Sequence, residues 1–431
     1  MGYTQDMRAP FDSPGKGTQT RRPTYLRRSM TYTHPGHLAL VACALLLAPR
    51  AAAAQTGPSV PTRAIGTVDV ESRDPFTAVY GLRELRDGRV IVADHREKTL
   101  QLLDLTRGAA TPVGRSGAGP AEWGSPGKLY ALPGDTIIML DFSNDRVLFI
   151  NPDGKAGATM PLGEKNPLST ADLIGIDANG RMLLVAERRP ANFRTGTSGV
   201  ADVMRYDRKS GRIDTVATLS LPKGEISAAT QLSGGLMRVA TNLPLAALDA
   251  AAITGDGRIV IVHSSPYRLE FIGVNGHRTV GPVAATPNIP VTDAEKDAFT
   301  RSQIRPGGIL VKVQGAPPPP SGGAKASPGG AAKMSSAEIK AMMNPDMTWP
   351  AVKPPFLTNA VQVAPDGRVW VLRTRAWNDS TPMFDVFDAA GRVVERVTLP
   401  KRTRLVGFGN SAAYLARTDD DDLIWLQRIR R

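Results

Sequence analysis

Runs of apolar, largely β-branched residues recur along the chain, and each follows a polar turn in which Gly stands next to Asp or Asn. Glycine can take the positive φ that a tight turn requires, and an apolar β-branched run is typical of a strand. The five clear copies are residues 87–94, 134–141, 179–187, 256–263 and 366–373. The pattern predicts repeated units of turn and strand.

The spacing of the copies predicts the architecture. The intervals are 46, 46, 77 and 110 residues between the anchor glycines Gly88, Gly134, Gly180, Gly257 and Gly367. A second apolar strand follows, as at Leu100–Asp104, and a degraded sixth copy runs from Leu405 to Leu426. A repeat of about 45 residues made of turn, strand, turn and strand is what a propeller blade requires. We therefore expect an all-β, six-bladed β-propeller over residues 55–431.

Two departures from the repeat have structural consequences. The 77-residue interval is too short for two blades, so we interpret it as one blade with long outer strands near 202–221 and 231–241. The last copy has only three strands before the chain ends. A propeller must cover its strand edges, and the segment Arg63–Glu71 contains Ile65, Val68 and Val70. We expect this N-terminal strand to complete the last blade.

Residues 286–355 interrupt the propeller between blades four and five. Thr292 with Glu295 three residues on is a capping pattern, which predicts a short helix over 291–299. Residues 315–332 are too rich in Pro, Gly, Ala and Ser to bury a core, and a second capped helix is expected over 335–343. The insertion is either a tolerated loop or a mobile lid over one face of the ring.

The N-terminal residues 1–54 have the pattern of a cleaved export signal. The apolar run Leu38–Leu47 is too short to span a bilayer, and the small residues Ala51–Ala54 follow it. We expect cleavage before Gln55 and a periplasmic or extracellular protein without a transmembrane span, whether translation starts at Met1 or at Met30. The alternative is a lipid-anchored protein, because the residues before Cys43 resemble a lipobox.

Composition excludes several classes of function. Cys43 is the single cysteine, so a chain cleaved before Gln55 has no disulfide, catalytic thiol or cysteine metal site. The formal net charge is +13, of which the leader contributes +5 (seven basic residues less two acidic ones), leaving +8 for residues 55–431. Neither a long Lys/Arg block nor an aromatic array accompanies this charge, so we expect no nucleic-acid partner. We expect a monomer.

The repeat phrases resemble the six-bladed TolB-like and NHL-type propellers of exported bacterial proteins. The segment Gly114–Pro126, a glycine-rich turn leading to Trp123 and a proline, is similar to their inter-blade phrase, and 384–399 with 405–428 is similar to their final blades. The resemblance covers about residues 62–428 apart from the insertion. It implies the architecture and leaves the activity open, because such proteins range from binding modules to lactonases and lyases.

Motifs for catalysis or metal binding are weak. Gly117 and Gly119 do not form a phosphate loop, because Pro120 follows and no helix pattern begins there. The acidic run 419–422 lacks the spacing of a calcium loop and is better interpreted as a solvated hairpin turn. The mature chain retains three histidines without metal-ligand spacing.

A lactonase-type propeller would hold calcium through Glu, Asn and Asp of different blades. The candidates Glu84, Asp141, Asn144 and Glu187 do not reproduce that signature, and we expect Asp141 to pair with Arg146 instead. We therefore expect no cofactor and no metal, with calcium as the alternative. No catalytic residue can be assigned.

The candidate ligand-binding residues come directly after the repeated strands. Equivalent positions in rotationally related blades meet at one face of the ring. The set is Asp94, His95, Arg96, Asp141, Asn144, Glu187, Arg188, His263, Arg373, Arg375 and Trp377. Arginines can bind an anion in bidentate fashion and a tryptophan can stack on a sugar, so the set predicts an anionic or sugar-like ligand. The alternative is a solvated rim of internal salt bridges.

Two classes of function remain. The first is an exported, non-enzymatic propeller that binds a peptide, a protein or an anionic glycan. The second is a propeller enzyme, either a lactonase, a lyase or a glycan-active hydrolase, with a metal in the central channel. The sparse histidines and the missing calcium pattern favour the first.

Overall fold

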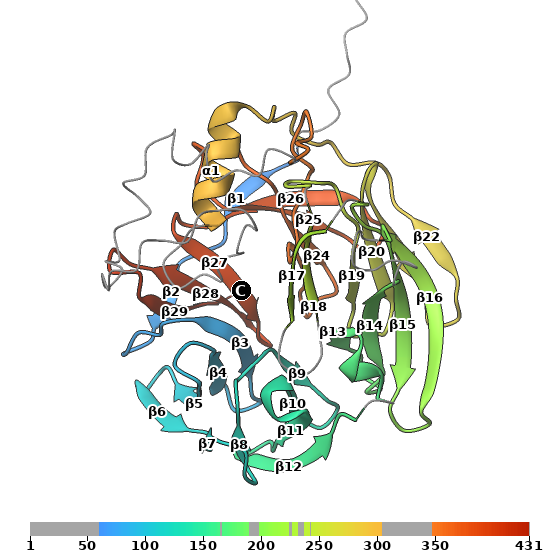
Figure 1. Ribbon diagram of the computed structural model, residues 1–431. Coiled ribbons are helices and arrows are strands. Elements are labelled where there is room, and N and C mark those ends of the chain that lie inside the picture. Colours follow the sequence, from blue (N-terminus) through green and yellow to red (C-terminus); the bar gives the residue numbers. More distant parts are fainter. Residues whose placement is uncertain are drawn as a thin grey trace, which may run out of the picture. The chain divides into compact units, whose positions relative to one another are not determined.

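The computed structural model describes residues 60–430, apart from 164–165, 189–197, 224–225, 232–236, 242 and 304–346. Residues Pro58–Arg431 form one compact unit, which is almost entirely β (Figure 1). The predicted leader, including Cys43, lies outside the described residues. Within the described ranges, no helix is both long and apolar enough to cross a membrane.

The first three blades are antiparallel sheets of four consecutive strands each. Blade one contains β3 (Val79–Glu84), β4 (Val90–Asp94), β5 (Thr99–Asp104) and β6 (Ala109–Pro112). Blade two contains β9 (Leu129–Ala131), β10 (Ile137–Asp141), β11 (Arg146–Ile150) and β12 (Ala156–Pro161). Blade three contains β13 (Asp172–Ile176), β14 (Met182–Glu187), β15 (Val200–Asp207) and β16 (Arg212–Ser220). The short strands β7 (Arg115–Ser116) and β8 (Glu122–Trp123) pair in the connection between blades one and two.

The other three blades follow the same plan. Blade four contains β19 (Ala250–Ile253), β20 (Ile259–Ser264), β21 (Tyr267–Ile272) and β22 (Arg278–Val280). Blade five contains β23 (Val361–Val363), β24 (Val369–Leu372), β25 (Met383–Phe387) and β26 (Val393–Thr398). Blade six contains β27 (Thr403–Phe408), β28 (Ala412–Thr418) and β29 (Ile424–Arg430). The predicted six-bladed β-propeller is confirmed.

Six apolar clusters join neighbouring blades, one cluster at each interface. The alternation of side chains along the second strand of a blade explains this arrangement. In β4, Val90 and Val92 pack toward blade six, whereas Ile91 and Ala93 pack toward blade two. The second strands therefore need apolar residues on both faces, which is the uninterrupted pattern that the repeat shows.

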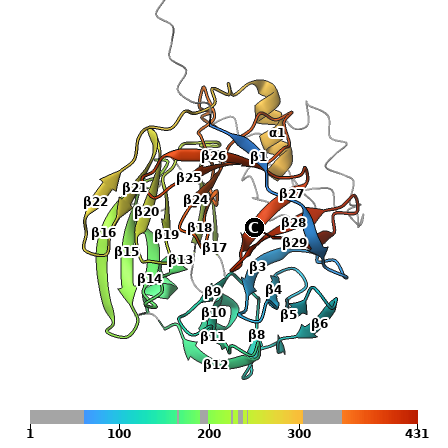
Figure 2. The same cartoon turned by 180° about the vertical axis from the view of Figure 1, so that it is seen from behind.

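The ring closes through the N-terminal segment, as predicted. The strand β2 (Val68–Glu71) pairs antiparallel with β29 and supplies the fourth strand of blade six. The pairing of β1 (Thr62–Ala64) was not anticipated, because β1 lies parallel to β26 at the outer edge of blade five. Figure 2 shows β1 beside β26 from behind. Ile65, between the two strands, is buried in the core shared by blades five and six.

The long third interval differs from its prediction in one strand. Residues 202–221 contain the outer strands of blade three, β15 and β16, as expected. The segment 231–241 does not extend that blade. Its described residues are Gln231, the last residue of β17 (Ile226–Gln231), and β18 (Met237–Thr241), and these two strands pair in a separate two-stranded sheet. An apolar β pattern identifies a strand but does not identify its partner.

The base of the insertion is folded. The helix α1 (Asp293–Gln303) begins after Thr292, whose hydroxyl accepts the Glu295 N–H at 3.4 Å, so the predicted cap is confirmed. Lys353 N–H donates to the Ile289 carbonyl at 2.9 Å and joins the two ends of the insertion. The predicted segments 315–332 and 335–343 lie outside the described residues.

Candidate functional site

The predicted site residues lie at the same end of successive second strands, but they do not form one cluster. Asp94 ends β4, Asp141 ends β10, Glu187 ends β14 and His263 stands one residue before the end of β20. In the described part of the chain, no hydrogen bond or ion pair joins members of this set from two different blades. Most members instead bind partners inside their own blade or in the adjacent connection.

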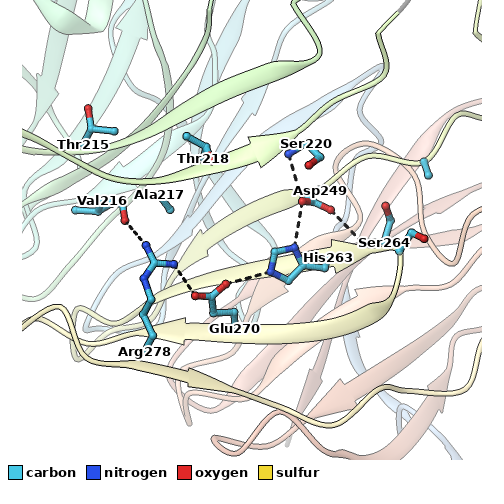
Figure 3. Close-up of a pocket in the computed structure, with 12 residues that line it drawn as sticks. Thr215, Val216, Ala217, Thr218, Ser220, Asp249, His263, Ser264, Glu270 and Arg278 are labelled. Carbon is cyan, nitrogen blue, oxygen red and sulfur yellow. Dashed lines mark hydrogen bonds and ion pairs between the residues drawn. The ribbon is translucent and has the colours of Figure 1, made fainter. Parts of the chain in front are cut away.

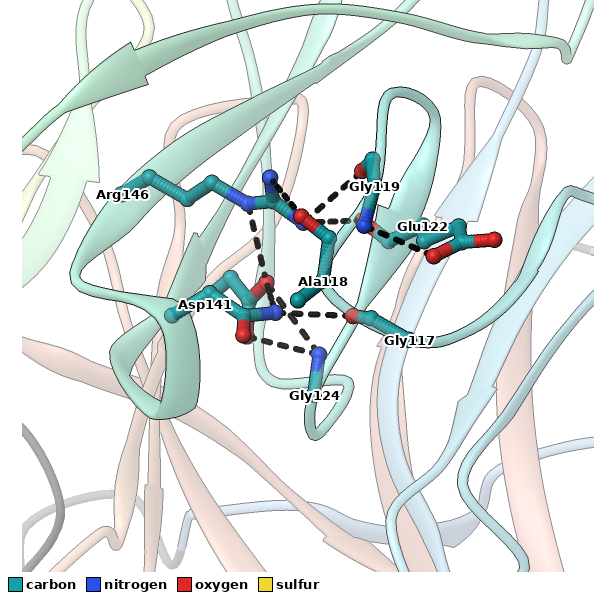
Figure 4. Close-up of polar contacts among 8 residues, drawn as sticks. Gly117, Ala118, Gly119, Glu122, Gly124, Asp141 and Arg146 are labelled. Carbon is teal, nitrogen blue, oxygen red and sulfur yellow. Dashed lines mark hydrogen bonds and ion pairs between the residues drawn. The ribbon is translucent and has the colours of Figure 1, made fainter.

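Asp94 and Asp141 are buried anchors for the connecting loops. Asp94 accepts the N–H groups of Thr77 at 2.7 Å and Ala78 at 3.1 Å. Asp141 accepts the Gly124 N–H at 3.0 Å and Asn144 Nδ2 at 2.7 Å (Figure 4). Carboxylates whose oxygens are taken by backbone donors hold a fold together and are not available to a ligand.

The predicted pairing of Asp141 with Arg146 is confirmed at 3.3 Å. Arg146 also donates to the carbonyls of Ala118, Gly119 and Glu122 at 3.0, 3.2 and 2.8 Å (Figure 4). One guanidinium thus fixes the glycine-rich turn between blades one and two. This turn is the phrase on which the family resemblance was based.

Most of the arginines in the predicted ligand-binding set form ion pairs within their own blades. Arg188 pairs with Asp202 at 2.6 Å, and Arg375 pairs with Asp379. Arg373 is almost fully buried and donates to both oxygens of Asp385 at 2.8 Å. The positive charge that was expected to attract an anion is therefore largely offset, and this face resembles the alternative of internal salt bridges.

The remaining members of the set are exposed at separate places. His95 Nδ1 lies 3.0 Å from the Pro126 carbonyl, and the His95 ring stacks obliquely on Tyr80 at 5.5 Å. Arg96 and Glu187 are exposed. The side chain of Trp377 is 57% exposed, and its backbone N–H donates to Glu295 of α1 at 2.8 Å. The insertion helix therefore docks on the connection that carries Trp377.

Three polar residues at the first or second position of inner strands were not predicted. Tyr80 is exposed in β3, and Asp172 begins β13, where burial raises the pKa of its carboxyl despite the charge of Lys128. Burial lowers the pKa of Arg404 in β27, which donates to the Val79 carbonyl. The available signal was their place at the start of each inner strand, immediately before the repeated phrase.

A cleft of about 700 Å³ lies between blades three and four (Figure 3). Of the predicted set, His263 is in its lining. Hydroxyl and charged side chains predominate, and consecutive residues of β16 form one wall. The lining residues are Thr215, Val216, Ala217, Thr218, Ser220, Ala247, Asp249, His263, Ser264, Ser265, Glu270 and Arg278.

A chain of ion pairs crosses this cleft. His263 Nδ1 lies 3.1 Å from Asp249 and Nε2 lies 3.2 Å from Glu270, which in turn binds Arg278 at 2.5 Å (Figure 3). The hydrogen bond to Asp249, reinforced by the one to Glu270, raises the pKa of His263 against the effect of burial. Burial opposes ionisation of Asp249, but hydrogen bonds from His263 and Ser264 outweigh it and lower its pKa.

These contacts favour the protonated form of His263. Ionised carboxylates only accept hydrogen bonds, so both ring nitrogens donate to them when the ring is protonated. A general base needs a ring nitrogen with a free lone pair. In its protonated form, His263 is held by two ion pairs and has no free lone pair.

Two of these ion-paired residues, Asp249 and Arg278, bind the edge of β16 that faces away from β15. Ser220 donates its N–H to Asp249 at 3.2 Å and accepts the Asp249 N–H at 2.8 Å. Arg278 donates to the Val216 carbonyl at 2.8 Å. The Val216 carbonyl and both backbone groups of Ser220 therefore face blade four, away from β15.

Thr218 stands midway between these two points. Backbone groups along a strand alternate in direction with a period of two, so the Thr218 N–H and C=O face the same side as those of Ser220. The buried Leu219 side chain and the Leu221 N–H, which donates to Gly199 beside β15 at 2.9 Å, fit this alternation. Thr218 thus presents one donor and one acceptor to the cleft.

The described residues do not assemble a metal site from three or more His, Cys, Asp or Glu side chains. Three of the four predicted calcium candidates make other contacts, and the fourth, Glu187, is exposed. Glu84 accepts the Tyr414 hydroxyl at 2.6 Å, and Asp141 and Asn144 anchor the loop described above. Calcium therefore stays an alternative prediction.

No protein-family model matches the sequence, and no curated protein matches it. Among solved structures, the chain is similar to regucalcin, a calcium-binding protein from Agrobacterium tumefaciens, with 12% identity, coverage of 86% of this chain and 97% of that one, and a TM-score of 0.40. A member of the DUF4221 family from Bacteroides vulgatus is 8% identical, with 85% and 98% coverage and a TM-score of 0.43. Virginiamycin B lyase from Staphylococcus aureus is 11% identical, with 84% and 98% coverage and a TM-score of 0.37.

Structural similarity at TM-scores below 0.5 does not indicate the activity of this chain. The fold is assigned from the strand pairing of the chain itself. The TolB-like or NHL-type assignment stays a prediction.

Proposed function

We propose that this protein is a non-enzymatic binding propeller that takes an extended peptide segment into the cleft between blades three and four. The observation that supports this proposal is the pair of Thr218 backbone groups facing the cleft between two bonded positions, Val216 and Ser220. A strand edge with a free donor and acceptor is a template for another strand.

The geometry limits how the peptide binds. Contacts from blade four already use the edge at Val216 and Ser220, so one peptide residue pairs with Thr218 and contributes two backbone hydrogen bonds. Each such bond contributes a net ~0.5–1.5 kcal/mol. Specificity then comes from the alternate peptide side chains, which meet the polar wall formed by His263, Glu270 and Arg278.

Charge balance favours a peptide over the anionic glycan in this cleft. The two cations, His263 and Arg278, are matched by the two anions, Asp249 and Glu270. A cleft with paired charges and hydroxyl side chains suits a polar ligand of low net charge. The occupied nitrogens of His263 favour binding over hydrolysis.

We further propose that the protein acts after export, as the apolar run before Gln55 predicts. An extracytoplasmic binding propeller would meet peptides or protein tails outside the cytoplasm. N-terminal sequencing of the exported protein tests this part independently of the cleft.

The test is selection from a random peptide library on the immobilised mature protein, followed by calorimetric titration of the selected peptides. Thr218→Pro removes the edge N–H without touching the pairing with β15, because proline is tolerated at a strand edge. Thr218→Val removes the hydroxyl but keeps both backbone groups. We expect Thr218→Pro to weaken binding at least tenfold and Thr218→Val to change it less than threefold. Equal affinities of the two variants, or no selected peptide, would refute the proposal.

A further inference from the structure

The chain of ion pairs in the cleft between blades three and four depends on a single proton. His263 lies between two carboxylates, with Nδ1 3.1 Å from Asp249 and Nε2 3.2 Å from Glu270 (Figure 3). A protonated imidazole donates to both, whereas a neutral imidazole has one N–H and one lone pair. After loss of the proton, one of the two carboxylates therefore faces a lone pair instead of a donor.

The two carboxylates are not equally free to move. Asp249 is buried and also accepts two backbone N–H groups, at 3.2 and 3.1 Å. In the described residues, the side chain of Glu270 binds only His263 and Arg278, and the Arg278 side chain is 49% exposed. A neutral ring therefore keeps its N–H on Nδ1, toward the fixed Asp249. The lone pair on Nε2 then repels Glu270, which is the carboxylate that can shift.

Glu270 is connected to the edge of β16 through Arg278. Arg278 Nη1 donates to Glu270 at 2.5 Å, and Arg278 Nη2 donates to the Val216 carbonyl at 2.8 Å. Val216 is the extra residue of a bulge in β16, because its two neighbours pair with consecutive residues of β15. The extra residue of a bulge is left out of the ladder, so Arg278 is the partner of this carbonyl. A shift of Glu270 together with Arg278 frees the Val216 carbonyl.

Other charged and titratable residues stand near the ring without joining this chain of contacts. From Thr215 onward, β16 lines the cleft with apolar and hydroxyl residues. The remaining groups on or beside the adjoining strands are Arg212, Asp214, Arg268 and His277. In the described part of the chain, no side-chain hydrogen bond or ion pair connects them to His263, Glu270 or Arg278. Histidine titrates near neutral pH, so His277 provides a control for His263.

We propose that protonation of His263 regulates the peptide cleft. The protonated ring holds Glu270 and Arg278 at the Val216 carbonyl, and loss of the proton releases this carbonyl to the peptide. This regulation rests on the proposed binding of a peptide at Thr218, two residues further along the same edge. A peptide strand that pairs with Thr218 can then also bond to Val216. One added backbone hydrogen bond corresponds to a gain in affinity of about two- to tenfold, so the peptide binds more tightly at higher pH.

The test is calorimetric titration of a library-selected peptide, without histidine and with blocked termini, between about pH 5 and about pH 9, where histidine changes its charge. Arg278→Met keeps an unbranched side chain and removes the donors to Val216. Its matched control is Arg188→Met, because Arg188 is 53% exposed and binds a carboxylate at 2.6 Å, against 49% and 2.5 Å for Arg278. His263→Asn removes the titrating ring, and His277→Asn is its control.

We expect the affinity of the wild type, Arg188→Met and His277→Asn to rise about two- to tenfold with pH. Arg278→Met should bind with the higher affinity at every pH, and His263→Asn should show no rise. Since the peptide prefers the neutral ring, its binding should also release protons from the wild type near the midpoint of this rise. That release is measured from heats in buffers of different ionisation enthalpy.

A peptide whose binding requires Thr218 but whose affinity is the same at every pH would overturn the regulation and leave the peptide site in place. An equal rise in Arg278→Met and Arg188→Met, or a rise that is lost in His277→Asn, would overturn it as well. If no peptide is selected, both proposals are wrong. If Arg278→Met fails to fold, the proton release of the wild type decides.

Discussion

Replacing Asp385 tests whether the arginines of the predicted face support the fold or await a ligand. Asp385 is fully buried and accepts from Arg373 at 2.8 Å, Arg396 Nε at 3.1 Å and the Tyr267 hydroxyl at 3.2 Å. The Arg373 side chain is 9% exposed, and its Nε has no partner among the described residues. Asp385 therefore balances the positive charge of this buried guanidinium. Asp385→Asn keeps the volume and removes the charge. Breaking a buried pair in this way costs about 3–5 kcal/mol.

The matched control is Asp202→Asn. Its partner Arg188 is 53% exposed, so the loss is expected to be ~0–1 kcal/mol. Equilibrium urea unfolding, followed by circular dichroism and by tryptophan fluorescence, measures both variants. At about 1.4 kcal/mol per tenfold, the folded population should fall at least a hundredfold for Asp385→Asn and less than tenfold for the control. Equal, small losses would show that the buried pair does not hold blade five, and Arg373 would again be a candidate for ligand binding.

Three further predictions concern closure, pH and maturation. Deleting residues 62–72 should destabilise the whole ring, because blade six loses its outer strand. Deleting 315–332 should change the stability little, because the entropy of loop closure depends only logarithmically on loop length. Equal unfolding midpoints of the two deletion variants would contradict both assignments. The pKa of His263 is raised in the fold, so its stabilising contribution is complete below its ordinary value of about 6.5 and is lost as pH rises through the folded value. Urea midpoints of the wild type and of His263→Asn should therefore approach each other as pH rises through the folded value, and a constant difference across pH would refute this. N-terminal sequencing of exported protein should begin at Gln55, and a lipid-modified start at Cys43 would show the alternative to be correct.

The architecture was predictable because it rests on local signals. A glycine turn followed by an apolar strand is visible within eight residues, and the two faces of β4 explain why that strand shows no polar alternation. The pairing of β1 was not predictable in this way. Three residues, Thr62–Ala64, carry no periodic signal, and a parallel partner more than 300 residues away leaves no trace in the local sequence.

The site was predictable only where its contacts are short in sequence. Asp141 and Arg146 are five residues apart, and their pairing was predicted correctly. The contacts that build the cleft are longer: Ser220 meets Asp249 across 29 residues, and Val216 meets Arg278 across 62. The position of His263 after the repeated strand was predictable from the sequence, whereas the carboxylates on either side of its ring were not.

The cleft follows from a mismatch between two neighbouring blades. The outer strand β16 has nine residues, whereas β22 of blade four has three. The space between two blades widens toward the periphery. The edge of β16 is therefore longer than the strand of blade four that could pack against it. In the described residues, the cluster at this interface contains seven buried apolar residues, fewer than the nine to eleven at the other five.

The outer part of the gap is occupied by His263, Glu270 and Arg278 in place of apolar side chains. Apolar residues would fill this space at lower cost, because charged groups lose hydration when they are partly buried. These charged side chains face the edge of β16. When a peptide strand enters, each of them can replace a contact with water by a contact with the peptide. The mismatch in strand length and the choice of side chains therefore both agree with the proposed entry of a peptide at this interface.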